Sequence, residues 1–374
     1  MKSPKVSVFL SYYNDAKFLK SSIDAILAQD FTDFELILLN HATTDDSRDI
    51  ARSYDDPRIV HIDKDFNYGA GCGLLIRDML NVARGKYIKL CCADDVLHRD
   101  CLSKLVEYLD NNSNCGFVCS KMDFIAGWGK KISGKYFDFL SNQEINSGSL
   151  LKSLSIGKNV ICYPTVMMRK DVLSEFNLDA SFILLLDASF YVNVLVNGWS
   201  CHRLDDELIS YRLHAGQTSR VCGDSVFMET VAFAGIFYNI KNVEYVKDIC
   251  ADVSFAQNLT QSDEKWFPFV MAVHFLMGTN ISFAISGYLY IHQLMNDDNL
   301  RAQVEQKFGF KIADFRKLYQ KSNAFQYFID TESKKLTILQ LIKLLCRRIF
   351  RVLTPKYYAN TIRNFRIKNK GVKK

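Results

Sequence analysis

The sequence predicts an α/β fold, in which a mostly parallel sheet is followed by a helical C-terminal region. Short apolar runs suited to buried strands alternate with segments of helical spacing over roughly the first 95 residues. Strands that alternate with helices pair in parallel, because each crossover helix returns the chain to the same edge of the sheet. The apolar run at residues 87–93 then ends abruptly in two adjacent carboxylates, Asp94 and Asp95.

The predicted elements follow one another regularly. A polar turn at residues 11–15 separates the first strand from a helix, and turn and N-cap residues at 40–47 follow the second strand. Gly69, Gly71 and Gly73 loosen the loop before a later helix. The predicted strands are residues 6–10, 34–39, 58–62 and 87–93, and the predicted helices are residues 18–27 and 74–83.

The position of Asp94 and Asp95 predicts a ligand site. Ligands of open parallel sheets bind at the carboxyl ends of the strands. Two carboxylates there suit Mg²⁺ or Mn²⁺, which take few protein carboxylates and bridge substrate phosphates. From this motif alone a second interpretation stays open, in which the two acids begin a solvated turn and cap a helix near Arg99.

Composition indicates an intracellular enzyme with one large domain and an appendage. The chain has 374 residues, of which 48% are apolar, so it can form a sizeable core. Its eleven cysteines are scattered, several in apolar runs such as Cys91-Cys92, and no Cys-x-x-Cys pair indicates zinc. We therefore expect reduced, mostly buried thiols. No basic and apolar leader precedes Val6, which argues against export.

Positive charge is concentrated at the C-terminus. Residues 334–374 hold 13 of the 47 Lys and Arg residues and no acid, which leaves 34 basic against 41 acidic residues elsewhere. Apolar residues crowd between the basic ones at 336–350, which predicts an amphipathic helix on an anionic membrane surface. Nucleic acid is not expected as a partner, because no nucleic-acid motif accompanies the charge. A plain solvated tail remains the alternative.

One long segment, residues 266–291, lacks Asp, Glu, Lys and Arg. Its polarity, which includes Pro268, His274 and Asn280, suits buried helices better than a membrane span. We therefore expect an α/β domain at 1–220, a helical region at 221–333 and the basic amphipathic tail at 334–374.

Several segments, in order, resemble the family 2 nucleotide-sugar glycosyltransferases, which have the GT-A fold. The resemblance covers roughly residues 4–220. The matching segments are residues 6–14, 26–36, 43–47, 85–88, 93–95 and 211–219. It implies a Rossmann-like, mostly parallel sheet and an inverting transfer of a hexosyl or related sugar from a nucleotide-sugar donor to a hydroxyl acceptor.

The resemblance and the basic tail together imply where the enzyme works. The expected acceptor is a lipid-linked oligosaccharide used in bacterial surface polysaccharide synthesis, of the O-antigen or capsule type. The expected location is the cytoplasm, with peripheral attachment to the inner membrane.

The resemblance also implies residue roles for the donor and the metal. The first loop of the family contacts the nucleotide, which here implies Ser11 and Tyr13. Its Asp-x-Asp motif falls on Cys92-Ala93-Asp94, so Asp94 is the implied ligand of Mg²⁺ or Mn²⁺. Asp95 would supply a second oxygen, orient a water or cap the next helix.

Two further donor contacts are implied despite a departure from the family pattern. Asn40-His41 stands where the family usually has two acids after the second strand. Asn40 and neutral His41 can still accept a hydrogen bond from a nucleotide base. A solvated turn is the alternative for His41.

The general base and the last contacts come from later segments. The family has an acidic pair where this chain has Leu186-Asp187, so Asp187 is the implied base, with a helix N-cap as its alternative role. His214 is implied near the metal or diphosphate, and Arg212 near the donor or its loop.

A second class of function remains open at this point. Acids of the family pattern are replaced at Cys92, Leu186 and Asn40-His41. Such replacements are also expected of a degenerate GT-A module that binds a sugar nucleotide or a partner without catalysis.

Overall fold

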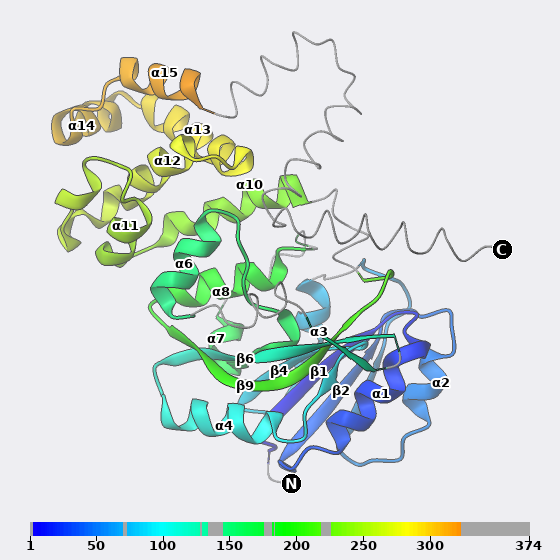
Figure 1. Ribbon diagram of the computed structural model, residues 1–374. Helices are drawn as coiled ribbons and strands as arrows, with labels where there is room; N and C mark the ends of the chain where they lie inside the picture. Colours follow the sequence, from blue (N-terminus) through cyan, green and yellow to red (C-terminus); the bar gives the residue numbers. More distant parts are fainter. Residues whose placement is uncertain are drawn as a thin grey trace, which may run out of the picture.

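The computed structural model describes residues 3–69, 73–127, 129–133, 145–175, 182, 184–217 and 226–322. It confirms the predicted α/β fold with a mostly parallel sheet and a helical C-terminal region (Figure 1). The predicted tail at 334–374 and the predicted domain boundary at residue 220 lie outside the described residues, so both stay predictions.

The described sheet has nine strands. Their bounds are β1 (Val6–Tyr12), β2 (Phe34–Asn40), β3 (Ile59–Asp63), β4 (Tyr87–Cys92), β5 (Val96–Leu97), β6 (Cys115–Ala126), β7 (Lys130–Ile132), β8 (Met167–Arg169) and β9 (Ser200–Leu213). They run in the order β3-β2-β1-β4-β8-β6-β9-β5, with β7 paired to β6. The first four of these are mutually parallel, β6 and β9 are parallel, and β8 runs antiparallel between β4 and β6.

The register of the parallel strands brings the predicted loops together. Ser11 of β1 is level with Leu39 of β2 on one side and with Cys92 of β4 on the other. The loops that follow β1, β2 and β4 therefore leave the sheet at one edge. That edge is where the sequence predicted a ligand site.

Helices cover both faces of the sheet (Figure 1). One face packs against α1 (Ala16–Leu27), α2 (Ser47–Arg52) and α4 (Cys101–Asn111), and the other against α3 (Gly73–Val82), α6 (Ser147–Ser155), α7 (Lys170–Ser174) and α8 (Leu186–Val196). The predicted helices at 18–27 and 74–83 correspond to α1 and α3. Strands that are apolar on both faces, such as β2, are what this double covering requires.

The C-terminal helices stack on α6 and α8 and continue the same apolar core (Figure 1). They are α10 (Val226–Ile236), α11 (Val243–Ile249), α12 (Phe267–Met277), α13 (Ile281–Met295), α14 (Asp298–Phe308) and α15 (Ile312–Lys321). Residues 266–291 thus form most of two buried helices, as predicted, with a break at Gly278. None of the described helices is both long and apolar enough to cross a membrane. The eight described cysteines are all free, and six of them are buried.

The close packing of α12 on α13 depends on Gly287. A Cβ added there would lie 2.4 Å from the carbonyl oxygen of Ala272 and 2.9 Å from the backbone nitrogen of Leu276. We expect Gly287→Ala to lower the free energy of unfolding by about 1–3 kcal/mol, because the two backbones must move apart. Thermal and urea denaturation followed by circular dichroism measure the change.

Gly235→Ala in α10 is the matched control, since nothing lies within 4 Å of its added Cβ. It should leave stability unchanged or raise it by up to about 1 kcal/mol through helix propensity. Equal stability of the two variants would contradict the packing argument.

Candidate active site

The loop after β4 carries a cluster of possible metal ligands. One ligand atom each of Cys92, Asp94 and Asp95 lies within 4.8 Å of the others. Asp95 is 1% exposed, and its Oδ1 accepts a 2.8 Å hydrogen bond from the backbone N–H of Arg212. Its Oδ2 is buried without a hydrogen-bond partner. Burial, and then the charge of Asp94, raise the pKa of Asp95 well above its ordinary value.

This donor set fits a divalent cation. An unpartnered buried carboxylate oxygen is costly, and a cation beside Asp94 and Asp95 would offset that cost. The alternative in which Asp95 caps the next helix is wrong. Its carboxylate bonds to β9, and the residue that precedes α4 is Asp100.

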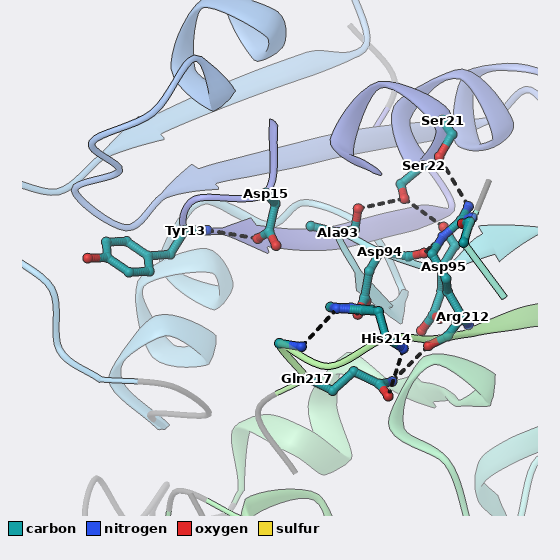
Figure 2. A network of polar contacts seen from close by, with 12 residues as sticks. Tyr13, Asp15, Ser21, Ser22, Ala93, Asp94, Asp95, Arg212, His214 and Gln217 are labelled. Atoms are coloured by element: carbon teal, nitrogen blue, oxygen red, sulfur yellow. Dashed lines mark hydrogen bonds and ion pairs between the residues drawn. The ribbon is translucent and has the colours of Figure 1, made fainter. Parts of the chain in front are cut away.

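His214 lies against Asp94 (Figure 2). Its Nε2 is 2.8 Å from Asp94 Oδ2, and its Nδ1 accepts a 3.3 Å hydrogen bond from the backbone N–H of Gly216. Because Nδ1 accepts a hydrogen bond, Nε2 carries the proton and donates a hydrogen bond to Asp94. His214 thus orients Asp94, and its role as a metal ligand, which would require it to release Asp94, stays a prediction.

Arg212 ties the same loop to the rest of the domain. It is 3% exposed, and its Nε donates a 2.7 Å hydrogen bond to the carbonyl of Asp94. Its Nη1 donates to the carbonyl of Gly127, and its guanidinium lies 4.7 Å from the centre of the Phe18 ring. The side chain is therefore placed to hold the loop rather than to reach the donor. The Gln217 side chain donates in turn to the Arg212 carbonyl (Figure 2).

Two residues that the sequence did not single out also make contacts at the site, Ser22 with this loop and Asp15 with the loop after β1. Ser22 Oγ, from α1, lies 2.8 Å from the Ala93 carbonyl and 2.6 Å from the Asp95 carbonyl. Asp15 accepts a 3.0 Å hydrogen bond from the Tyr13 N–H (Figure 2). Burial raises the pKa of Asp15 to about 6, and the nearby charge of Asp94 adds to the rise.

The loop after β2 is tied down by its own side chains. Asn40 Nδ2 donates a 2.9 Å hydrogen bond to Asp63, and its Oδ1 accepts a 3.0 Å bond from the Thr43 N–H. The predicted contact of Asn40 with a base would therefore compete with these two bonds.

His41 is 4% exposed, so the alternative in which it is a solvated turn residue is wrong. Its Nε2 accepts the backbone N–H of Tyr68, and burial, followed by the charge of Lys64, lowers its pKa. A neutral ring accepting at Nε2 carries its proton on Nδ1. The half-exposed Tyr13 ring lies 6.2 Å from the His41 ring, so these two predicted donor contacts are neighbours. Ser11, the remaining predicted donor contact, pairs with Cys92 at the carboxyl ends of the parallel strands.

Asp187 lies in the first turn of α8, where Leu185 is the N-cap, so the N-cap alternative is wrong. Its Oδ1 accepts a 2.7 Å bond from the Ala188 N–H, and its Oδ2 a 3.2 Å bond from Asn159. Burial raises the pKa of Asp187 to about 6, although both hydrogen bonds oppose the rise.

Cys162 is near both this carboxylate and the loop after β4. Burial, and then the charges of Asp95, Asp187 and Asp94, raise the pKa of the Cys162 thiol well above its ordinary value. Asp187 and the carboxylates after β4 are therefore both near the Cys162 side chain.

The start of α8 is held from outside the α/β domain. Glu229 of α10 accepts hydrogen bonds at one oxygen, Oε2, from the backbone N–H groups of Leu184 at 2.8 Å and Leu185 at 3.0 Å. Its Oε1 is buried without a hydrogen-bond partner. Sequence reasoning missed Glu229, because no local pattern connects it to residues more than 40 positions earlier.

Comparison with known proteins agrees with this architecture. Residues 7–176 match the family model described as glycosyl transferase family 2. The chain is 25% identical to the Escherichia coli UDP-Glc:alpha-D-GlcNAc-diphosphoundecaprenol beta-1,3-glucosyltransferase WfaP, over 66% of this chain and 90% of that protein. It is 25% identical to the putative teichuronic acid biosynthesis glycosyltransferase TuaG of Bacillus subtilis, over 56% of this chain and 79% of that protein.

Solved structures share the fold at low sequence identity. The structure of Staphylococcus aureus TarS 1–349 with UDP-GlcNAc matches with a TM-score of 0.57 and 13% identity, over 89% of this chain and 93% of that one. The Pyrobaculum calidifontis mannosyltransferase PcManGT, solved with GDP-Man and Mn²⁺, matches with a TM-score of 0.50 and 15% identity, over 85% and 86% of the two chains. The match over residues 7–176 thus assigns the chain to glycosyltransferase family 2. The chain is a glycosyltransferase with a GT-A-like fold.

Proposed function

We propose that this protein is an inverting, metal-dependent glycosyltransferase that transfers a sugar from a nucleotide donor to a hydroxyl of a saccharide acceptor. One observation carries the proposal. The carboxylates after β4 and the carboxylate of Asp187 belong to distant segments, yet both are near Cys162. In this arrangement Asp94 would face the donor diphosphate and Asp187 the acceptor hydroxyl.

The donor side consists of the loops after β1, β2 and β4. The half-exposed Tyr13 ring, with the buried His41 ring beside it, would offer a surface to a nucleotide base, and Ser11 pairs with Cys92 next to the metal-binding residues. Asp94, with Asp95, would hold Mg²⁺ or Mn²⁺, whose charge would offset the negative charge of the departing diphosphate. WfaP is named for a UDP-sugar donor, and TarS was solved with one.

Asp187 serves as the base. It accepts the proton of the acceptor hydroxyl while that oxygen attacks the anomeric carbon on the face opposite the leaving diphosphate, so the configuration inverts. A carboxylate buried enough to have a pKa of about 6 is a stronger base than an exposed one and is still ionised at neutral pH.

The proposed acceptor is a lipid-linked saccharide used in cell-surface polysaccharide synthesis. WfaP is named for a diphosphoundecaprenol-linked acceptor, and TuaG for teichuronic acid biosynthesis. The basic tail at 334–374 would hold the enzyme on the cytoplasmic surface of the inner membrane.

A donor screen tests the proposal. Purified protein is incubated with Mn²⁺ and a panel of nucleotide sugars, and nucleotide release is measured. We expect slow metal-dependent release from at least one donor, because water can replace the acceptor. Asp94→Asn should abolish it, whereas the matched variant Asp30→Asn changes an exposed carboxylate elsewhere and should not. Tight donor binding without release in the native protein would instead support a binding module without catalysis.

The role of Asp187 predicts a pH profile. Only the ionised carboxylate accepts a proton, so kcat should rise about tenfold per pH unit below pH 6 and level off above it. Asp187→Asn should lower kcat about 10²–10⁴-fold, with the KM for the donor little changed. Both are measured by transfer to a saccharide acceptor at saturating donor. A flat profile between pH 5 and 7, or near-normal turnover in the variant, would remove Asp187 as the base.

The tail predicts salt-sensitive membrane binding. Each Lys or Arg near an anionic surface contributes about 1 kcal/mol, and salt screens that contribution. Full-length protein should co-sediment with phosphatidylglycerol vesicles at low salt and be released at high salt, whereas a chain ending at residue 333 should stay in solution. Equal sedimentation of the two forms would refute a membrane-binding tail.

A further inference from the structure

Asn159 follows a turn that the end of α6 holds in one shape. The backbone N–H of Gly157 donates a 2.9 Å hydrogen bond to the Leu154 carbonyl, and the N–H of the next residue donates a bond of the same length to the Ser153 carbonyl. These two bonds, with Gly157 at a φ of +77°, form the Schellman motif that ends many α-helices. The Ser153 hydroxyl also donates a 2.8 Å bond to the Lys158 carbonyl. The backbone that leads into Asn159 is therefore fixed.

The helical C-terminal region packs against the same turn. A Cβ added at Gly157 would lie 2.7 Å from Asn280 Nδ2 and 3.8 Å from Phe283 Cε2, so the glycine allows the start of α13 to approach. Asn280 is itself held in place, because as the N-cap of α13 its Oδ1 accepts the backbone N–H groups of Ser282 and Phe283. The turn that carries Asn159 is thus held by both α6 and α13.

The Asn159 side chain joins this turn to the proposed base. Its Oδ1 accepts a 3.0 Å hydrogen bond from the backbone N–H of Ile161, which identifies the oxygen end of the amide. The nitrogen end, Nδ2, donates a 3.2 Å bond to Asp187 Oδ2. The other carboxylate oxygen, Oδ1, accepts the Ala188 N–H at 2.7 Å. With a bond at each oxygen, the carboxylate cannot rotate about its Cβ–Cγ bond without breaking one of them.

The other groups around Asp187 give its ionised form no support. The titratable side chains that interact with it are Cys162 and Tyr163, before β8, and Tyr191 of α8. Burial raises the pKa of each of these three well above its ordinary value, so all are uncharged near neutral pH. Glu229 of α10 bonds to the two residues before α8. Among the described residues no cation lowers the pKa of Asp187, and Asn159 is the one side chain that does.

We propose that Asn159 is a positioning residue for glycosyl transfer, which aims the Asp187 carboxylate at the acceptor hydroxyl. Each oxygen of an ionised carboxylate has a second lone pair, so the two hydrogen bonds fix the directions from which a proton can be received. The Asn159 amide also stabilises the ionised carboxylate against the effect of burial. This inference rests on the proposed role of Asp187 as the base, and adds the residue that sets its direction and its charge.

Titration of Asp187 tests the contact without any turnover. Protein labelled with ¹³C at its Asp carboxyl carbons is titrated by NMR in EDTA, and the Asp187 signal is the one that Asp187→Asn removes. We expect a midpoint of about 6 in the native protein. In Asn159→Ala the midpoint should be higher by about 0.5 pH unit or more, because the ionised form loses a hydrogen-bond donor.

Asn197→Ala is the matched control. Asn197 is the exposed residue that follows α8, and its Nδ2 donates a 2.8 Å bond to the Asn193 carbonyl at the far end of the helix from Asp187. The variant removes a similar bond from an exposed asparagine, and we expect the Asp187 midpoint to stay at its native value.

Asn159→Asp separates the contact with Asp187 from the shape of the turn. The new carboxylate can still accept the Ile161 N–H, but it offers Asp187 no donor and adds a like charge beside it. The midpoint should therefore rise at least as far as in Asn159→Ala. A native midpoint in either Asn159 variant would overturn the proposal, as would an equal rise in Asn197→Ala.

Transfer kinetics test the role in the reaction. At saturating donor, Asn159→Ala should lower kcat about 10–10²-fold, because the base is no longer held in direction. The pH at which kcat is half-maximal should rise by the same amount as the NMR midpoint, and the KM for the donor should be unchanged. A lower kcat with an unmoved pH profile, or a native kcat, would overturn the proposal. If the native protein transfers no sugar, glycosyl transfer fails as the function, while the NMR titration still decides whether Asn159 controls Asp187.

Discussion

The buried carboxylate of Asp95 fixes the geometry on which the rest of the site depends. Asp95 accepts the backbone N–H of Arg212, and the Arg212 side chain donates back to the carbonyl of Asp94, so β9 and the loop after β4 hold each other. A charged group at 1% exposure is tolerated only with such partners. The second oxygen of Asp95 has none, and burial together with the charge of Asp94 raises the pKa of this carboxyl well above its ordinary value. A cation bound beside Asp94 would favour the ionised form of Asp95.

The loops around this carboxylate depart from the family pattern in a way that their hydrogen bonds explain. Asn40 bonds both to Asp63 at the end of β3 and to the following turn, so its amide keeps the loop shape. Neutral His41 accepts a backbone N–H that an acid would also accept, but it adds a ring beside Tyr13. The substitutions preserve the shape of the loop and remove negative charge from it.

The strands and helices around the site were predictable because their signals are local. Apolar runs, helical spacing and turn residues predicted the bounds of β1, β2, β3, β4, α1 and α3 to within a few residues. The rule that ligands bind at the carboxyl ends of parallel strands indicated the edge of the sheet that carries the candidate active site. The partners of the site residues were not predictable. Arg212 was expected near the donor or its loop, and its side chain holds the loop after β4 in place. No sequence pattern pointed to Ser22, Asp15 or Glu229. Each of these contacts joins residues whose proximity only the completed sheet and helix packing create.

The contact of Glu229 with the start of α8 bears on how this protein could have diversified. The two residues that precede the helix presenting Asp187 donate their N–H groups to a carboxylate from α10, so the helical region supplies part of the framework around Asp187. Acceptor-binding regions can be exchanged between enzymes freely only when they are joined to the catalytic domain by a linker. Here an exchanged C-terminal region would have to bring its own acid to the same two N–H groups. Recombination between relatives is therefore constrained at a position that belongs to no motif recognised in the sequence.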